Sequence, residues 1–159
     1  LLASDNLKIE TTNDVLGLEL CGALKNVLAI SAGIGAGAGM NKNYQAAAFS
    51  KGLEEMAALG AKLGAKRETF YSLAGIGDLF LSSTNKESRN FSFGLGLGEG
   101  KSVDEAKQGN TVEGIGTTES VYSLVQKFDL KSPIFENTFK VVFKGKNPKE
   151  ALEDIWAKI

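Results

Sequence analysis

One stretch of sequence decides the fold of this chain: Val15-Leu16-Gly17-Leu18-Glu19-Leu20-Cys21-Gly22-Ala23-Leu24-Lys25-Asn26-Val27-Leu28-Ala29-Ile30. Placed on a helix, its apolar residues fall on nearly all sides, and a helix that is apolar all round is a buried helix. We expect it to begin after Asn13 or Asp14, either of which suits an N-cap, and to run to about Ala32. The sequence therefore predicts an all-α, multi-helical domain built around one central buried helix.

Helical spacing also dominates the rest of the chain, and strand-like alternation is confined to Leu7–Thr11. That short run is either a final strand or an extended linker leading into the domain. Further helices are expected at about 44–63, 69–73, 79–83, from a capping box at Ser102, and at 116–127, 133–143 and 148–158. A length of 159 residues suits a single domain, residues 1–159, of about seven to nine helices.

Composition excludes several classes of function. The 18 basic and 19 acidic residues leave a formal net charge of −1, so no basic excess favours nucleic-acid binding. We count no apolar stretch of the roughly 18 residues that a membrane helix needs, and expect no membrane insertion. A lone cysteine, Cys21, and the absence of histidine argue against a metal site. Acid–base chemistry must then depend on Lys, Asp, Glu or Tyr.

The glycine-rich run Gly33–Ala38 fits the pattern G-x-G-x-x-A, a variant of the dinucleotide-binding fingerprint. That fingerprint requires a strand before it and a helix after it, whereas a helix is expected before this run. Glycines also interrupt helices. We therefore expect the run to end the central helix and to form an interhelical loop, flexible or closely packed, and not a phosphate-binding turn.

Lys25 is the first candidate for chemistry, because it lies within the most hydrophobic helix of the chain. Its neighbours three and four residues away are small or apolar, so its side chain faces a crevice or the core. In such a place an ammonium can serve as a proton donor or acceptor. The alternative is that the ammonium extends along its stem to the surface. Asn26 follows directly, and either orients the same ligand or bonds a neighbouring helix.

Two polar motifs could complete a site with Lys25. Asp78 follows two glycines and precedes an apolar helix, which suits an N-cap. Its carboxylate could also pair with a catalytic lysine or bind a substrate hydroxyl, and these roles are compatible with capping. Ser88-Arg89-Asn90 groups three hydrogen-bond donors, and the planar guanidinium suits phosphate. This second motif could equally open a helix or be a solvated loop with a capping serine.

The order and wording of several motifs resemble NAD(P)-dependent glycerol-3-phosphate dehydrogenases. The segments that carry the resemblance are Asp14–Val27, Leu73–Leu79, Ser88–Gly94, Val112–Gly114 and Pro133–Ile134. The resemblance implies a helical domain similar to the C-terminal domain of 6-phosphogluconate dehydrogenase, preceded by a Rossmann domain. It also implies interconversion of dihydroxyacetone phosphate and sn-glycerol 3-phosphate for phospholipid synthesis, in the cytoplasm and as a homodimer.

The resemblance further assigns roles to residues. It makes Lys25 the catalytic acid–base group. Asn26 is added to the expected substrate-binding residues because it directly follows Lys25 in the sequence. The residues implied to bind substrate are Lys25, Asn26, Asp78, Ser88, Arg89 and Asn90, and those implied to touch the dinucleotide are Arg89, Thr111 and Glu113. NAD or NADP would be held mainly by the Rossmann domain, from which residues 1–12 would be the linker. The chain alone is therefore expected to be inactive.

Three positions depart from the family pattern: Lys51 stands where arginine is expected, Cys21 where glycine is commoner, and Ser82 where threonine is usual. None lies in the motifs expected to bind substrate. Two other interpretations remain open at this point. One is a related helical dehydrogenase that acts on a hydroxy acid, and the other is a non-catalytic helical module used for oligomerisation.

Overall fold

A computed structural model describes residue 4 and residues 9–159, and in the latter range all regular structure is helical. The elements are α1 (Val15–Gly37), α2 (Lys42–Leu63), α3 (Arg67–Phe70), η1 (Leu73–Gly77), α4 (Asp78–Thr84), α5 (Arg89–Gly98), α6 (Val103–Lys107), α7 (Glu113–Lys127), α8 (Pro133–Lys144) and α9 (Pro148–Trp156). The predicted all-α class is confirmed. Residues 9–12 form neither strand nor helix, and most of the expected linker lies outside the described residues.

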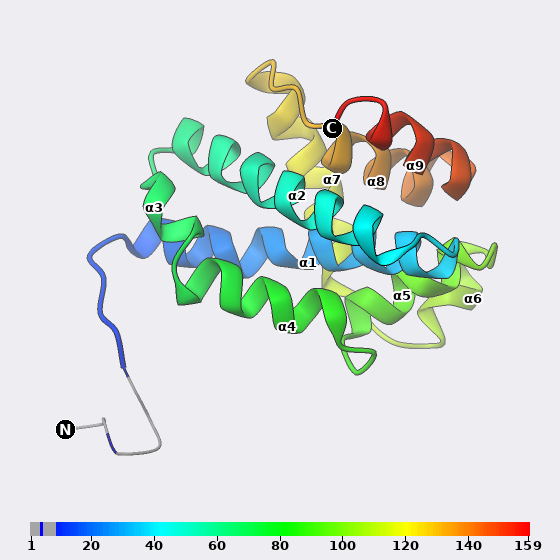
Figure 1. Ribbon diagram of the computed structural model, residues 1–159, viewed down its shortest axis with the longest axis horizontal. Helices are drawn as coiled ribbons and strands as arrows, with labels where there is room; N and C mark the ends of the chain where they lie inside the picture. The colour runs from blue at the N-terminus through cyan, green and yellow to red at the C-terminus, as the bar shows by residue number, and fades with distance from the viewer. Residues whose placement is uncertain (1–3, 5–8) are drawn as a thin grey trace.

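Helix α1 runs through the middle of the domain, with α2 along one side and α4 and α5 along the other (Figure 1). It also contacts α3, η1, α7, α8 and α9. Asp14 begins the helix by accepting the backbone N–H of Gly17 at 3.1 Å. Val27, Ala29 and Ile30 are completely buried. The central buried helix expected from the sequence is therefore present.

The expected end of α1 near Ala32 is wrong, because the helix continues through the glycine-rich run to Gly37. These glycines allow α1 and α5 to touch through their backbones. A Cβ at Gly33 would lie 2.1 Å from the carbonyl oxygen of Phe91, and one at Gly94 would lie 2.1 Å from that of Ile30. The pairs Gly33/Gly37 and Gly94/Gly98, which we call the glycine seam, thus replace the loop that was expected.

Two other local expectations need correction. The segment 74–78 was expected to be a loop, but Leu73–Gly77 forms a single π-helical turn that continues directly into α4. Helix α5 was not expected beyond its possible start at Ser88, and the structure forms it despite three glycines within it. The remaining helices lie close to their predicted positions, and Gly64 ends α2 with a left-handed conformation at φ 100°.

The length and composition of α1 also satisfy the criteria for a membrane-spanning helix. It has 23 residues and a mean hydropathy of 1.5 over its most apolar window, so the statement that no stretch reaches this threshold is wrong for α1. The core helix of a soluble protein meets the same criteria. Because other helices pack against α1 on several sides, its surroundings are those of a core helix.

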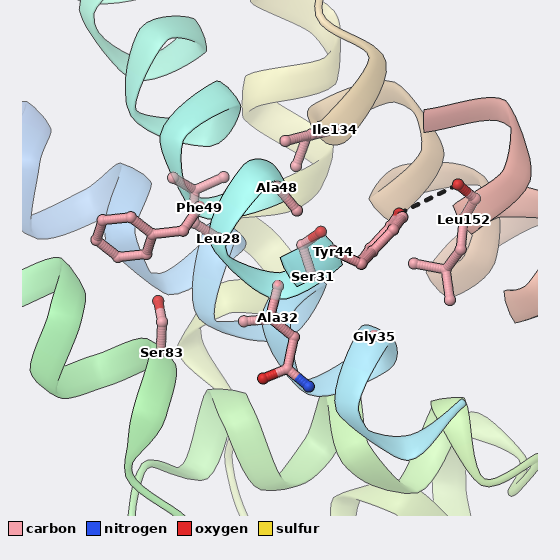
Figure 2. A pocket seen from close by; sticks show the side chains of 11 residues that line it. Leu28, Ser31, Ala32, Gly35, Tyr44, Ala48, Phe49, Ser83, Ile134 and Leu152 are labelled. Carbon is pink, nitrogen blue, oxygen red and sulfur yellow. Dashed lines mark hydrogen bonds between the residues drawn. The ribbon is translucent and has the colours of Figure 1, made fainter. Parts of the chain in front are cut away.

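A small apolar cavity of about 50 Å³ lies between α1 and the helices α2, α4, α8 and α9 (Figure 2). Leu28, Phe49 and Ile134 are among the side chains that line it, and the Tyr44 hydroxyl donates to the carbonyl of Leu152 at 3.1 Å beside it. Ser83 Oγ, also at this cavity, is buried without a hydrogen-bond partner among the described residues. The lining offers no charged group, so this cavity does not suit a phosphate-bearing substrate.

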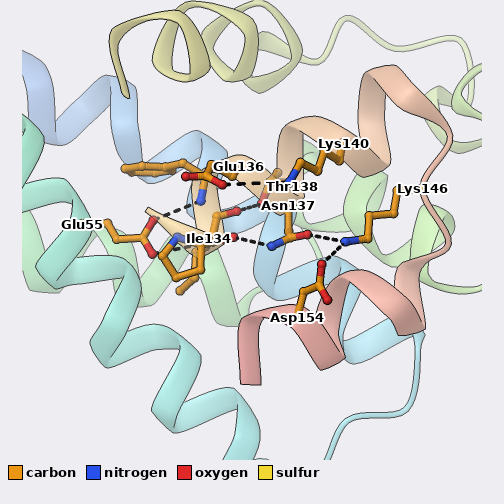
Figure 3. Close-up of polar contacts among 10 residues, drawn as sticks. Glu55, Ile134, Glu136, Asn137, Thr138, Lys140, Lys146 and Asp154 are labelled. Atoms are coloured by element: carbon orange, nitrogen blue, oxygen red, sulfur yellow. Dashed lines mark hydrogen bonds and ion pairs between the residues drawn. The ribbon is translucent and has the colours of Figure 1, made fainter. Parts of the chain in front are cut away.

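One buried carboxylate joins α2 to α8 (Figure 3). Glu55 is 2% exposed, and its two oxygens accept the backbone N–H groups of Ile134 at 2.9 Å and Phe135 at 3.1 Å. These N–H groups belong to the first turn of α8, where a helix offers them no partner. Burial raises the pKa of Glu55 to about 8, although both N–H bonds act to lower it. The folded protein therefore favours the protonated acid at neutral pH.

Raising the pH is consequently expected to weaken the fold through Glu55. The pKa of Glu55 is about 8 in the folded protein and 4.5 in its ordinary state, so the folded protein holds the proton more tightly. The stabilisation that this proton gives the fold is complete below pH 4.5 and is lost as the pH rises through about 8. Within that window the free energy of unfolding should fall by up to about 1.4 kcal/mol per pH unit. Chemical denaturation across the window should give a flatter slope for Glu55→Gln, which cannot titrate, than for wild type. The exposed neighbour Glu54→Gln is the control, and equal slopes in all three proteins would contradict the expectation.

Candidate active site

Lys25 and Asp78 form an ion pair that connects the middle of α1 to the first residue of α4. The Lys25 Nζ atom lies 2.7 Å from Asp78 Oδ1 and 2.6 Å from Oδ2. The side chains are 23% and 43% exposed, so the pair is accessible to a small molecule without lying in open water. Among the described residues the Asp78 carboxylate accepts no backbone N–H, and it is therefore a partner of Lys25 and not a cap.

The π-helical turn η1 places Asp78 opposite Lys25. Asp14 fixes the preceding α3 to the start of α1, because its Oδ2 accepts the Thr69 hydroxyl at 2.6 Å and the Lys66 backbone N–H at 2.9 Å. The Thr69 hydroxyl bond is the main cause that lowers the pKa of Asp14. The chain then turns through η1 directly into α4. π-Helical turns are frequent at functional sites, where they shift the side chains that follow.

Lys25 lines an open polar cleft of about 370 Å³. The cleft is bounded by α1, the end of α4, the α4–α5 connection, the start of α5 and the start of α7. Its lining residues are Lys25, Asn26, Leu81, Ser82, Asn85, Glu87, Ser88, Arg89, Asn90 and Glu113. Six of the residues chosen from the sequence are thus brought together. Leu81, Ser82, Asn85 and Glu87 were not chosen as site residues, although the polar sequence of 82–90 was an available signal for the last three.

Ser88-Arg89-Asn90 opens α5 at the edge of the cleft. Ser88 is the N-cap, its Oγ accepting the Phe91 N–H at 3.4 Å. Arg89 reaches across to α7, where its guanidinium lies 3.4 Å from the Thr111 carbonyl and 3.3 Å from Glu113 Oε1. These contacts are long for charge-assisted hydrogen bonds. With the Arg89 side chain 58% exposed, its remaining N–H groups are available to a ligand.

Asn90 points inward from α5 and bonds both α1 and α7. Its Nδ2 donates to Asn26 Oδ1 at 3.0 Å, and its Oδ1 accepts the Gly114 backbone N–H at 2.9 Å. Thr111 does not line the cleft, and its contact with Arg89 is through the backbone carbonyl. The predicted site residues therefore form one connected group around the cleft, with Thr111 at its rim.

Other groups near Lys25 add little to the chemistry of the site. Cys21 lies one turn before Lys25, but burial raises the pKa of its thiol to about 11, with smaller contributions from Asp14 and Asp78. A thiol in that condition is a poor nucleophile at neutral pH. In the part of the chain that the structure describes, no three His, Cys, Asp or Glu side chains gather in a metal-binding arrangement.

Comparison with known proteins identifies the family of this chain. Residues 14–153 match the family model described as the NAD-dependent glycerol-3-phosphate dehydrogenase C-terminus. An NAD(P)+ glycerol-3-phosphate dehydrogenase from Photobacterium profundum is 44% identical over 157 residues, which are 98% of this chain and 46% of that protein. One from Carboxydothermus hydrogenoformans is 44% identical over 96% of this chain and 46% of its own length.

Solved structures give the same result for the fold. The glycerol-3-phosphate dehydrogenase of Coxiella burnetii superposes with a TM-score of 0.91 at 38% identity, over 98% of this chain and 48% of that one. The enzyme from Saccharomyces cerevisiae gives a TM-score of 0.86 at 27% identity, over 96% and 46% of the two chains. This chain thus spans about half the length of the relatives it matches. On the extent of these matches, the chain belongs to the NAD-dependent glycerol-3-phosphate dehydrogenase C-terminal family.

Proposed function

We propose that this chain is the substrate-binding and catalytic half of an NAD(P)-dependent glycerol-3-phosphate dehydrogenase, reducing dihydroxyacetone phosphate to sn-glycerol 3-phosphate. The observation that supports this most directly is the Lys25–Asp78 ion pair at a cleft that Arg89 also lines. An ammonium and a guanidinium on one cleft suit a substrate with a carbonyl group and a phosphate group.

The Lys25 ammonium is the proton donor in this proposal. Reduction of a ketone adds a hydride to the carbon and a proton to the oxygen. A bound nicotinamide would supply the hydride. Lys25 stabilises the negative charge that develops on the substrate oxygen and transfers a proton to it, leaving a neutral amine. Asp78 holds the ammonium at 2.7 Å and so fixes where the substrate oxygen must lie.

The phosphate would lie against Arg89 and the start of α5. The guanidinium offers a planar pair of N–H donors, which matches the oxygens of a phosphate. Ser88 lies at the N-terminus of a ten-residue helix, where unpaired backbone N–H groups favour an anion. In this proposal Arg89 binds the charged end of the substrate and Lys25 acts at the carbonyl group.

The rim formed by Arg89, Thr111 and Glu113 is chemically suited to a dinucleotide. An exposed guanidinium can pair with a nucleotide phosphate, and the Glu113 carboxylate, 65% exposed, can accept ribose hydroxyls. NAD or NADP would therefore contact this rim, while a further domain holds most of the dinucleotide.

We extend the proposal to a single helical domain, residues 1–159, with 1–12 as the linker from a Rossmann domain. A homodimer in the cytoplasm and a role in phospholipid synthesis complete it.

The proposal is tested with the longer protein that contains this chain. Oxidation of NADH and of NADPH is measured with and without dihydroxyacetone phosphate, and the isolated 159 residues are assayed in parallel. Substrate-dependent oxidation by the longer protein alone is the expected result. A well-folded longer protein that oxidises neither cofactor with this substrate would refute the proposal, and turnover by the isolated chain would refute the dependence on a further domain.

Arg89→Ala is expected to raise the KM for dihydroxyacetone phosphate by about 100-fold, with a smaller effect on kcat, because the guanidinium binds the phosphate in both ground and transition states. Arg89→Lys keeps the charge without the planar fork and should recover only part of the loss. Steady-state kinetics with the substrate varied at saturating cofactor measures both. An unchanged KM in Arg89→Ala would place the phosphate elsewhere.

A further inference from the structure

A second pocket, of about 530 Å³, lies where α2, the start of α8 and the residues after α9 meet. This volume falls within the usual range of small-molecule sites, roughly 300–1,000 Å³. None of its lining residues lines the cleft that contains Lys25, so the two are separate. The lining consists of Lys51, Lys131, Ser132, Pro133, Glu136 and Lys158. We call it the lysine pocket, and the proposed function uses none of these residues.

The lining of the lysine pocket carries a net positive charge. Three ammonium groups oppose one carboxylate, that of Glu136, whose side chain is 22% exposed. Lys51 is half-buried and pairs with Glu54 at 3.0 Å. In the part of the chain that the structure describes, Lys131 and Lys158 lie within 4.0 Å of no carboxylate. Two ammonium groups can therefore pair with a negatively charged ligand.

Ser132 adds a hydroxyl group to this lining. It is the N-cap of α8 and is 1% exposed. A serine at this position ordinarily accepts the backbone N–H of the second or third helical residue. Here those residues are Ile134 and Phe135, and both N–H groups donate to the Glu55 carboxylate of α2 (Figure 3). The Ser132 side chain consequently makes no capping bond, and no described residue hydrogen-bonds to its hydroxyl.

The chemistry of these groups favours a phosphate. A buried hydroxyl in a folded protein is normally hydrogen-bonded, and Ser132 lines the lysine pocket, so its partner comes from the pocket. A phosphate presents several acceptor oxygens around one centre and can therefore accept from a hydroxyl and from two ammonium groups together. Glu55, on the other side of the α8 start, opposes an anion little at neutral pH, because burial raises its pKa to about 8.

We propose that the lysine pocket is an anion site separate from the cleft, and that it takes the phosphate group of inorganic phosphate or of a phosphate monoester. Ser132 donates to one phosphate oxygen, and Lys131 and Lys158 neutralise the charge. These groups come from the α7–α8 connection and from the segment after α9, and Lys51 of α2 completes the lining. A bound phosphate thus connects distant parts of the sequence and stabilises the folded state. The proposal does not depend on the dehydrogenase function.

Thermal unfolding of the longer protein measures this binding. The probes are inorganic phosphate and the monoester glycerol 2-phosphate, with chloride at equal ionic strength as the reference. An Arg89→Ala background removes the guanidinium that the proposed function assigns to the cleft. We expect a saturable rise in melting temperature with phosphate, and the probe with the lower apparent Kd identifies the preferred source of the phosphate group. An equal rise with chloride would mean general screening of the lysines and would overturn the proposal.

Two double variants locate the site. Lys131→Gln with Lys158→Gln removes both ammonium groups that have no carboxylate partner, and should raise the apparent Kd for phosphate by about tenfold. Lys62→Gln with Lys149→Gln changes the net charge equally at exposed lysines outside the lysine pocket, and should leave the Kd unchanged. Equal losses in the two double variants would show that phosphate responds only to total charge, which contradicts a site at this position.

Ser132→Ala separates ligand binding from a structural role. Because the hydroxyl has no protein partner among the described residues, its removal should leave the melting temperature in chloride unchanged or raise it. The apparent Kd for phosphate should rise several-fold. A lower melting temperature in chloride with an unchanged Kd would show that Ser132 serves only the fold, and would overturn its place in the site. These measurements need no turnover, so a failure of the proposed dehydrogenase function would not affect them.

Discussion

Lys25→Met in the longer protein is expected to lower kcat for reduction of dihydroxyacetone phosphate by about 10²- to 10⁴-fold, the usual contribution of a positioned acid or base. Methionine fills nearly the same space without a proton to give or a charge to stabilise the developing alkoxide. The KM should change less, because the phosphate end of the substrate does not contact this residue. Initial rates at saturating substrate measure the loss.

Two further variants identify the ammonium as the responsible group. Lys62→Met replaces an exposed lysine near the end of α2 and should leave kcat unchanged. Lys25→Ala opens a space beside Asp78 that a small alkylammonium ion can occupy, so added methylamine should restore part of the rate. A Lys25→Met protein that retains a wild-type rate would show that another group donates the proton. Loss of folding is not expected, because Asp78 remains 43% exposed.

Gly33→Ala is expected to lower the free energy of unfolding by about 3 kcal/mol or more, a large fraction of the stability of a small domain. The added methyl would meet the Phe91 carbonyl oxygen at 2.1 Å and the Leu95 nitrogen at 2.7 Å. Both are backbone atoms of α5, which cannot move aside by changing a rotamer. The two helices must therefore separate, and chemical denaturation measures the cost.

Gly22→Ala is the control for this effect, because it makes the same change in the same helix where a Cβ would meet nothing within 4 Å. Alanine favours a helix interior over glycine by up to about 1 kcal/mol, so this variant should be as stable as wild type or more stable. A similar loss in both variants would show that helix propensity and not the close approach at the glycine seam determines the result.

The chemistry of the cleft was more predictable than its geometry. Lys25 and Asp78 are 53 positions apart in the sequence, and no periodicity could pair them. Their pairing depends on the π-helical turn before α4, for which sequence patterns have no dependable signal. The motif resemblance selected residues of which six line one cleft, but it could not show that Thr111 contributes a backbone carbonyl or that Asn90 faces Asn26.

The overall class was predictable because residues 15–30 are apolar on nearly all sides of a helix, which favours a helix surrounded by other helices. The errors came from glycine. In Gly33–Ala38 the glycines were taken as helix breakers, as they are in isolated helices, and the glycine-rich α5 was not predicted beyond its start. Contact between two backbones reverses that preference, and such a contact involves residues about 60 positions apart. Propensities of single residues contain no information about it.

The glycine seam also has a consequence for substrate choice. Helix α1 carries Lys25 and α5 begins with the phosphate-facing residues, and the two helices are in backbone contact, so their spacing has almost no freedom to adjust. The proposed enzyme would therefore measure the distance between the reacting carbon and the phosphate of its substrate with a nearly rigid frame. Substitutions that lengthen or shorten the accepted substrate should occur in the 85–88 connection, while the two helices stay as they are.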